Sequence, residues 1–380
     1  MRTKLRAWVG LLVVASLWGW TACSSTKPKG GGGTGALLVA TQGDMAVSSF
    51  QVDLDTGKLT TQGMSVTTGG SAPTTMVITP DGSTAFVANK GSNDIARYTV
   101  NSDGTVGAVS GNQAVSGVSP VSLAVDPSGT FLFVANQGSD DISIYSISGT
   151  TLTEVADSPF PTAPDPVAVA VAPNLDVLYV ANNVNGTVSA YDFDSTTGEL
   201  TMPVPGSPFS TGGVAPSGLA IATTANGTFL YAANAGSNNV SAFAVCATVT
   251  TSCLVPDGSL TPLSGSPYSA QLGPVALAAT PSGEFLYAVD KGSNQVSAYK
   301  ISAATGELTP ASPATISTGL NPVAIGIPST GHYVYVTNFG GASVSSYRIV
   351  KDSAGVETGA LQLVEAPVVT AGQPAAVALK

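Results

Sequence analysis

Short stretches in which apolar and polar residues alternate recur along the chain. The clearest stretches run through an apolar pair into Ala-Asn and then a Gly-Ser-Asn turn, as at residues 86–93. Alternation with a period of two places successive side chains on opposite faces of a β-strand. The pattern therefore predicts strands joined by tight turns. Seven copies align, the last three of them weaker: residues 86–93, 133–140, 231–238, 287–294, 38–45, 179–186 and 335–342.

The copies follow one another at nearly constant spacing. Counted from the position of the Asn, the separations are 48, 47, 46, 52, 56 and 48 residues. A period of about 40 to 50 residues that contains short strands is typical of the blades of a β-propeller. The aligned positions are Thr41, Asn89, Asn136, Asn182, Asn234, Asp290 and Asn338.

A proline that begins an apolar segment also occurs once in each copy. Proline suits the first residue of a strand, where its missing N–H group costs little. The seven prolines are Pro73, Pro120, Pro166, Pro216, Pro274, Pro322 and Pro374.

The two ends of the repeated region are incomplete in complementary ways. The region opens in mid-repeat at residue 36, and the segment 374–380 has no following strands of its own. Pairing this segment with the first copy would close the ring and protect the sheet edges. The sequence thus predicts an all-β fold over residues 36–380. We expect a seven-bladed β-propeller with four-stranded antiparallel blades, closed by the C-terminal strand joining the N-terminal blade.

Composition agrees with a turn-rich β protein. Only 9% of the residues are charged, whereas about 25% is usual, and the chain contains 43 Gly and 25 Pro. The net charge is −10. Nucleic acid is therefore not an expected partner, because binding phosphates requires positive charge.

The first 23 residues are typical of an export signal. Arg2, Lys4 and Arg6 precede an uncharged apolar run at residues 7–20, which is too short to span a bilayer comfortably. Small residues then lead to Cys23, as in a bacterial lipobox, although Trp20 stands where Leu is usual. The sequence predicts a lipoprotein-type signal peptide over residues 1–23, with Cys23 as the lipid anchor. A plain cleaved signal and an uncleaved anchor are the alternatives.

The Gly-rich stretch at residues 24–35 is predicted to be a flexible tether. An anchored protein of this kind would face the periplasm or sit on the outer membrane, and could reach the cell surface. The lipid would attach it to the membrane.

Cys246 and Cys253 lie in the insertion that lengthens the fifth copy. In an exported chain, two cysteines this close most simply form a disulfide that closes a hairpin. Metal binding is the lesser interpretation, because no second cysteine pair or nearby histidine completes a site. Neither a metal nor a cofactor is expected.

Groups for catalysis are scarce. His332 is the only histidine, and it aligns with a turn between the first and second strands of its blade, so we expect it to be solvated. Arg97 and Arg348 fall in third strands, away from the axis. The repeated Asn residues are more simply explained as turn residues than as a ligand-binding ring. No catalytic residue is predicted. Weak ligand-binding candidates at the mouth of the channel are Asp165, Asp290, Asn321 and Gln373.

The residue pattern of the repeats resembles that of the YVTN-repeat and lactonase-type seven-bladed propellers, and so do the later Thr-Gly-Glu-Leu and Gly-Ser-Pro-Phe segments. The resemblance covers residues 36–380 and implies hydrolysis of a sugar lactone, as in 6-phosphogluconolactonase. In lactonase members a Pro-Arg-His stretch begins an inner strand. Here none of the seven prolines is followed by Arg or His.

Three functions follow as hypotheses. The first is a lipid-anchored envelope propeller that binds an unidentified small molecule or envelope protein without catalysis, and it is preferred because lactone hydrolysis needs a base and an oxyanion partner. The second is a lactonase-type hydrolase, which would make the protein an enzyme. The third is a structural or adhesive surface protein.

Overall fold

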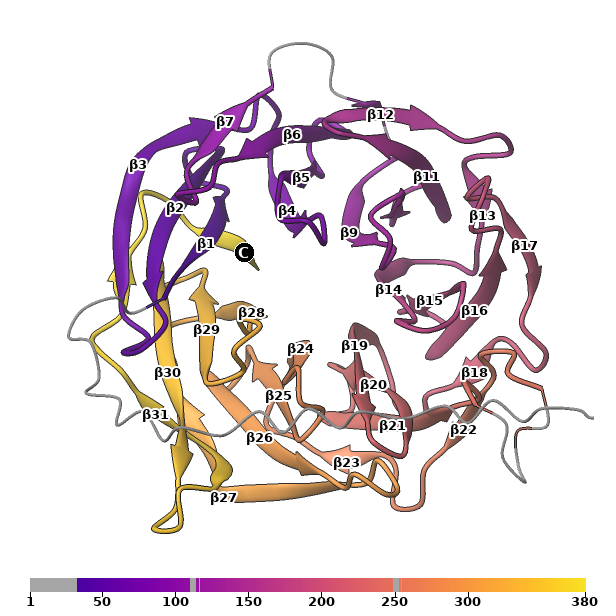
Figure 1. Cartoon of the computed structure of the whole chain (residues 1–380). Coiled ribbons are helices and arrows are strands. Elements are labelled where there is room, and N and C mark those ends of the chain that lie inside the picture. Colours follow the sequence, from indigo (N-terminus) through magenta and orange to yellow (C-terminus); the bar gives the residue numbers. More distant parts are fainter. Residues whose placement is uncertain (1–32, 110–113, 116, 249–252, 254) are drawn as a thin grey trace, which may run out of the picture. The chain divides into compact units, whose positions relative to one another are not determined.

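The chain is built of short antiparallel strands arranged around a central axis (Figure 1). The computed structural model describes residues 33–109, 114, 115, 117–248, 253 and 255–380. Residues 33–380 form one compact unit. The predicted signal peptide, Cys23 and most of the predicted tether lie outside the described residues. Within the described ranges, no helix is long and apolar enough to cross a bilayer.

Seven sheets of four main strands make up the ring, so the predicted blade number and strand number are confirmed. We call the blades A to G in chain order. The innermost strand of each blade starts at one of the seven repeated prolines. The inner strands, from blade A to blade G, are β33 (Pro374–Leu379), β4 (Pro73–Ile78), β9 (Pro120–Val125), β14 (Pro166–Val171), β19 (Pro216–Thr224), β24 (Pro274–Ala279) and β28 (Pro322–Gly326).

The second strands carry the core, because both of their faces pack against other strands. The second strands are β1 (Thr34–Thr41), β5 (Thr84–Asn89), β10 (Phe131–Asn136), β15 (Val177–Asn182), β20 (Gly227–Asn234), β25 (Phe285–Asp290) and β29 (Tyr333–Asn338). The third strands are β2 (Ala46–Asp53), β6 (Asp94–Val100), β11 (Asp141–Ser148), β16 (Thr187–Phe193), β21 (Asn239–Val245), β26 (Gln295–Ile301) and β30 (Ser343–Lys351).

The outer edge is continuous in two blades and broken in the other five. The outer strands are β3 (Leu59–Thr67), β7 (Val106–Ala108), β12 (Thr151–Glu154), β17 (Leu200–Pro203), β22 (Leu260–Pro262), β27 (Leu308–Ser317) and β31 (Glu357–Leu363). Short strands that pair with the same third strand beyond the break are β8 (Ala114–Val115), β13 (Phe160–Pro161), β18 (Phe209–Ser210), β23 (Tyr268–Ser269) and β32 (Val368–Val369).

Serine side chains replace a missing backbone partner at three of these breaks, in blades C, D and E. In blade D, the Ala190 N–H donates to Ser207 Oγ at 2.9 Å. In blade E, the Ala242 N–H donates to Ser266 Oγ at the same distance. The repeated Ser-Pro segment thus satisfies the third strand where the outer strand leaves the ladder.

The ends of the described chain share blade A, as predicted. β33 pairs with β1 in antiparallel register from Leu37↔Leu379 to Thr41↔Pro374. It also contacts the inner strands of blades B and G. The C-terminal strand therefore closes the ring. Thr34 and Gly35, predicted as the end of the tether, belong to β1 instead.

Neighbouring blades are held together by apolar packing and by tyrosine hydroxyls. Each core cluster combines residues of two adjacent blades, as Tyr231 of blade E and Leu286 of blade F illustrate. The Tyr231 hydroxyl also donates to the Gly306 carbonyl of blade F at 2.8 Å. Tyr179, Tyr287 and Tyr335 make the same kind of bond to the blade that follows.

The structure explains why four copies of the sequence repeat keep the complete turn sequence and three do not. The last residue of each strong turn adopts a positive φ, and its side-chain oxygen accepts the N–H of the residue before the next blade's proline. These interblade bonds measure 2.7 to 2.8 Å: Asn93 with Ser119, Asp140 with Asp165, Asn238 with Gly273 and Asn294 with Asn321. The three weak copies have Met45, Gly186 and Ala342 at this position and cannot make the bond.

Cys246 and Cys253 form a disulfide in the insertion between β21 and β22. Their Cα atoms are 5.4 Å apart. The bond lies on the outside of blade E, because β19 and β20 separate β21 from the axis.

Candidate functional site

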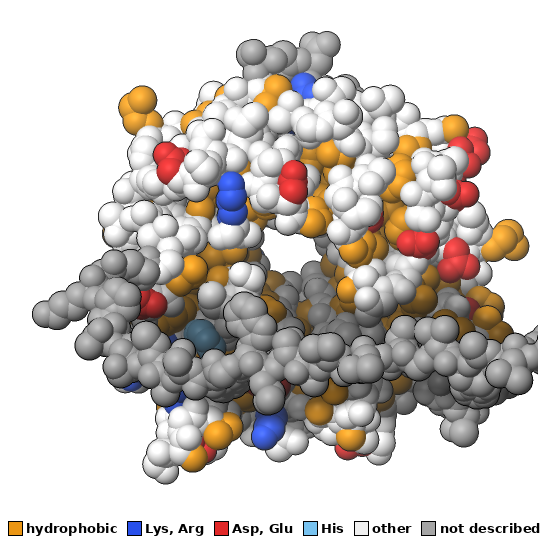
Figure 2. All heavy atoms as spheres, in the orientation of Figure 1, with side chains coloured by type: hydrophobic (Ala, Val, Ile, Leu, Met, Phe, Trp, Pro, Cys, Tyr) orange, Lys and Arg blue, Asp and Glu red, His pale blue; other side chains and the backbone are white. Residues whose placement is uncertain are grey.

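The axial channel is lined by the first halves of the seven inner strands. A section of about 440 Å³ is bounded by three residues from each strand, such as Val121, Ser122 and Leu123 of β9. The described residues that line this section include no ionisable side chain. Figure 2 shows one face of the molecule, hollowed at its centre, with hydrophobic and uncharged polar side chains around the hollow and charged side chains scattered.

Two of the few hydroxyl groups in the channel donate hydrogen bonds to backbone carbonyls of the next blade. Thr74 Oγ1 donates to the Pro120 carbonyl at 3.1 Å, and Ser217 Oγ donates to the Pro274 carbonyl at 2.8 Å. Each bond joins an inner strand to the next blade. The walls of the channel can therefore hold water or an apolar group, but they supply neither a base nor a cation.

Polar and charged groups appear where the channel opens beside the Asn turns. A mouth cavity of about 310 Å³ lies across blades F, G, A and B. Its residues are Gln42, Thr74, Lys291, Val323, Phe339 and Ala375. In the described part of the chain, the Lys291 side chain makes no hydrogen bond or ion pair with a protein group. Its ammonium is thus available to a ligand.

Three of the mouth residues, Gln42, Lys291 and Phe339, occupy one position of the repeat, directly after the Asn position, which the sequence interpretation missed. Each second strand ends at the Asn position, whose side chain is buried, and the next residue begins the turn that borders the mouth. This next position also carries bonds to the following blade, such as Gln42 Nε2 to the Pro73 carbonyl and Lys90 Nζ to Gln137 Oε1, at 3.0 and 2.6 Å. The seven residues are Gln42, Lys90, Gln137, Asn183, Ala235, Lys291 and Phe339.

Three predicted ligand-binding residues stand directly before an inner-strand proline. Asp165 is half-buried, and Asn321 and Gln373 are exposed. All three contribute backbone groups to the ring: the N–H groups of Asp165 and Asn321 form the interblade bonds above, and the Gln373 carbonyl accepts the Gln42 N–H at 2.8 Å. None of the three lines the mouth cavity.

Asp290, the fourth predicted ligand-binding residue, lies inside blade F with no exposed surface. Its Oδ2 accepts a hydrogen bond from Ser297 Oγ at 2.7 Å. Burial raises the pKa of this carboxyl to about 6, and hydrogen bonds from Ser297 and from the Gln271 backbone offset part of the effect. The structure therefore separates Asp290 from its neighbour Lys291, which faces the mouth.

The Asn residues at the same position in other blades are also fully buried. Asn136 Nδ2 donates to Ser143 Oγ at 2.8 Å, and Asn234 Nδ2 donates to Ser241 Oγ at 2.7 Å. They stabilise the blade interior and do not ring the mouth with free amides.

His332 occupies the predicted turn before β29, but it is paired. Its Nδ1 lies 2.7 Å from Glu357 Oε1, and its side chain is 53% exposed. The pair belongs to a separate cavity of about 430 Å³ between blades G and A. Arg348 also lines this cavity, whereas Arg97 is an interblade residue whose Nη1 donates to the Thr150 carbonyl at 2.8 Å.

Comparison with known proteins identifies relatives of this architecture. The family profile described as "Lactonase, 7-bladed beta-propeller" matches residues 38–262 and 256–373. The match confirms the resemblance drawn from the repeats. No curated protein gives a significant match.

Solved structures with the same fold include several bacterial propellers. The Pseudomonas aeruginosa periplasmic gluconolactonase PpgL superposes with a TM-score of 0.73 at 20% identity, covering 91% of this chain and 99% of that one. A candidate 6-phosphogluconolactonase from Bacteroides fragilis gives 0.74 at 19% identity, covering 91% and 98%. A protein from Lactobacillus plantarum gives 0.72 at 20% identity, covering 91% and 99%. At these identities the likeness establishes the fold.

Proposed function

Because the chain belongs to the seven-bladed β-propeller lactonase family, we propose that it hydrolyses the lactone of a sugar acid at the mouth of its channel. The observation that carries this proposal is the mouth cavity, where an unpaired ammonium, an amide and an aromatic ring converge. The family match favours hydrolysis over the hypothesis of binding without catalysis. The names of the similar structures suggest gluconolactone and 6-phosphogluconolactone as first substrates.

Each group at the mouth has a chemical use for a lactone. The Lys291 ammonium can donate to the carbonyl oxygen and stabilise the negative charge that develops there. Gln42 and Thr74 offer polar atoms to the substrate hydroxyls. Phe339 supplies an apolar face for the C–H side of the sugar ring.

The reaction balances without a further reactant. A water molecule adds to the carbonyl carbon, and the bond between this carbon and the ring oxygen breaks. The ring oxygen takes a proton and becomes a hydroxyl group, and the acid releases a proton to solvent. The described residues that line the mouth include no carboxylate or imidazole. The base is therefore solvent, and the rate should rise with hydroxide concentration.

Replacing Lys291 tests the assignment. We expect Lys291→Ala to lower kcat/KM for gluconolactone by about 100-fold, the cost typical of losing an oxyanion donor. The measurement is proton release by the purified protein, corrected for spontaneous opening of the lactone. Lys300→Ala is the matched control, because Lys300 is exposed on β26 and distant from the mouth residues. Equal turnover by both variants, or none above background in the parent, would contradict the proposal.

We also propose that the protein works outside the cytoplasm, anchored by a lipid on Cys23. The basic start, the apolar run and the lipobox-like cysteine support this, and so does the Cys246–Cys253 disulfide, since disulfides persist in oxidising compartments.

Substitution of the anchor residue provides the test. We expect Cys23→Ser to abolish incorporation of an alkyne-labelled fatty acid and to move the protein from the membrane fraction to the soluble fraction. The propeller is untouched by this change, so its thermal unfolding serves as the control. Unchanged labelling and fractionation would rule out the anchor.

A further inference from the structure

The cavity between blades G and A is chemically richer than the channel. It lies at the end of β29 where Tyr333 stands, whereas the mouth lies beyond Asn338 at the other end. A strand of this length separates the two ends by roughly 17 Å. The cavity is therefore distinct from the mouth, and its volume of about 430 Å³ is in the range of sites for small molecules.

One wall of the cavity holds an oriented imidazole. Glu357 Oε1 lies 2.7 Å from His332 Nδ1, and the Glu357 side chain is only 16% exposed. A carboxylate on one ring nitrogen fixes the ring and leaves the other nitrogen for a ligand. The His332 carbonyl is itself held by the Ile349 N–H at 2.9 Å.

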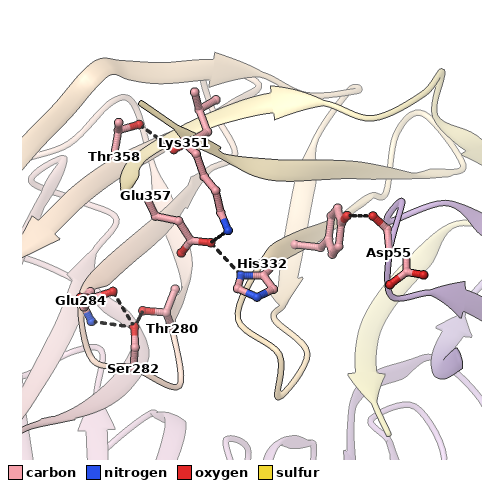
Figure 3. Close-up of polar contacts among 10 residues, drawn as sticks. Asp55, Thr280, Ser282, Glu284, His332, Lys351, Glu357 and Thr358 are labelled. Carbon is pink, nitrogen blue, oxygen red and sulfur yellow. Dashed lines mark hydrogen bonds and ion pairs between the residues drawn. The ribbon is translucent and has the colours of Figure 1, made fainter. Parts of the chain in front are cut away.

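Two cations stand beside this pair. The Lys351 Nζ lies 3.9 Å from Glu357 Oε1, which is beyond hydrogen-bond distance and leaves its donors available. Arg348 donates to Gln362 Oε1 through Nε and Nη2 at 2.9 and 2.5 Å. This contact orients the guanidinium and uses two of its five N–H groups. Figure 3 shows Lys351 and His332 pointing toward Glu357.

The opposite wall comes from blade A and is firmly packed. The Tyr333 hydroxyl donates to the Asp55 carbonyl at 2.5 Å, and the Tyr335 hydroxyl donates to the Gly57 carbonyl at 3.1 Å. A Cβ on Gly57, whose φ is +74°, would lie 2.2 Å from the Tyr333 ring. The turn that carries Asp55 is therefore seated directly on the aromatic ring (Figure 3).

The cavity depends on an extended outer hairpin in blade G; blade E also has a long outer hairpin, with fourteen residues between Val245 and Leu260. Eleven residues connect the paired residues Ile349 and Leu361 of its outer hairpin, whereas six connect Ile301 and Leu308 in blade F. The added length continues the ladder to Lys351↔Glu357 and places Glu357 against His332, with Lys351 beside Glu357. Repetition of the fold does not require this extension, so it calls for a separate explanation.

We propose that this cavity is a binding site for a small polyhydroxylated carboxylate, such as a sugar acid. Lys351 and Arg348 attract the carboxylate, because both cations line the cavity. His332 lies beside them and can accept a hydrogen bond from a ligand hydroxyl or donate one to it, and the Asp55 carboxylate across the cavity accepts hydrogen bonds from hydroxyl groups. The site is independent of hydrolysis at the mouth.

The single histidine makes the site directly observable, since His332 is the only imidazole in the sequence. We expect sodium gluconate to shift the ring resonances of histidine-labelled protein in a saturable manner by nuclear magnetic resonance at constant pH. Sorbitol, which lacks the carboxylate, and acetate, which lacks the hydroxyls, should produce much weaker shifts. Lys351→Gln should weaken gluconate binding at least tenfold, whereas the matched Lys300→Gln should leave it unchanged.

Three outcomes would overturn the inference: no saturable shift at tens of millimolar gluconate, equal shifts with acetate, or full affinity in Lys351→Gln. Lys351 is exposed, and the thermal midpoint of the variant shows whether it is folded. The result is separable from the proposed function. Lys291→Ala should show the lower kcat/KM for the lactone and keep the gluconate shift of His332.

Discussion

Removing residues 374–380 is expected to abolish cooperative folding of the propeller. The deletion takes away β33 and leaves β1 without its partner on the axial side. It also removes Val377 and Leu379 from the core cluster that includes Tyr335. Without β33, the axial edge of β1 is unpaired, and its exposed backbone N–H and C=O groups can pair with strands of other chains.

The size of the effect follows from the lost interactions. Each backbone hydrogen bond contributes about 1 kcal/mol net, and each half-buried Val or Leu also about 1 kcal/mol. The ladder from Leu37↔Leu379 to Thr41↔Pro374 and the two apolar side chains together contribute on the order of 5 to 10 kcal/mol. This is comparable with the whole stability of a typical domain.

Urea unfolding, followed by circular dichroism, measures the effect. The truncated chain should lose its sigmoidal transition and aggregate, and a synthetic peptide of residues 373–380 added in trans should restore part of the transition. A scrambled peptide of the same composition is the control. If the truncated protein unfolds with the parent midpoint, the C-terminal strand does not close the ring.

Replacing Asp290 by asparagine is expected to stabilise the protein at neutral pH by up to about 3 kcal/mol, as the raised pKa of this carboxyl implies. Five other blades have asparagine at this position, and Asn234 donates to its serine partner at 2.7 Å. In blade F the bond is reversed, because Ser297 donates to Asp290. The Asp290→Asn variant restores the arrangement of the other blades, and it carries no charge into the buried site.

The direction of the pH dependence follows from the raised pKa of Asp290. Its pKa is about 6 in the folded protein and 3.8 in the reference state. The folded state therefore binds the proton more tightly than the unfolded state. The stability contributed by this proton is fully present below about pH 3.8, falls as the pH rises, and is lost once the pH passes about 6. Two pKa units correspond to roughly 3 kcal/mol.

The test measures the unfolding free energies of the parent and of Asp290→Asn between pH 4 and pH 8. The difference between the two proteins separates the effect of this residue from that of other titrating groups. The variant should gain its advantage between about pH 4 and pH 6 and keep it above that range. Glu284→Gln, at an exposed turn of the same blade, is the control. Parallel curves would show that Asp290 ionises without cost.

The architecture could be predicted because its signals are local and repeated. The period of the Asn turns fixes the number of blades, and the incomplete first repeat leaves one way to close the ring. The interblade bonds of Asn93, Asp140, Asn238 and Asn294 explain why four copies of the repeat keep the complete turn sequence. The turn is recognisable in the sequence. The partner of its last residue lies some 25 to 35 residues further along the chain and is not recognisable there.

The site was harder to predict because it depends on where each second strand ends and its turn begins. Asp290 and Lys291 are adjacent, but Asp290 is the buried last residue of β25 and Lys291 is the exposed first residue of the turn. The sequence interpretation chose Asp290 for the mouth, whereas the structure places Lys291 there. The contact of His332 with Glu357 depends on the register of an extended hairpin, which no periodicity reveals.

A crystal structure of the protein soaked with gluconolactone would test the central claim most directly. The account predicts a lactone or its acid at the mouth, with an oxygen within hydrogen-bond distance of Lys291 Nζ and the sugar ring against Phe339. Density only in the neutral section of the channel beside Val121 and Leu123, or Lys291 pointing away from an occupied mouth, would contradict it.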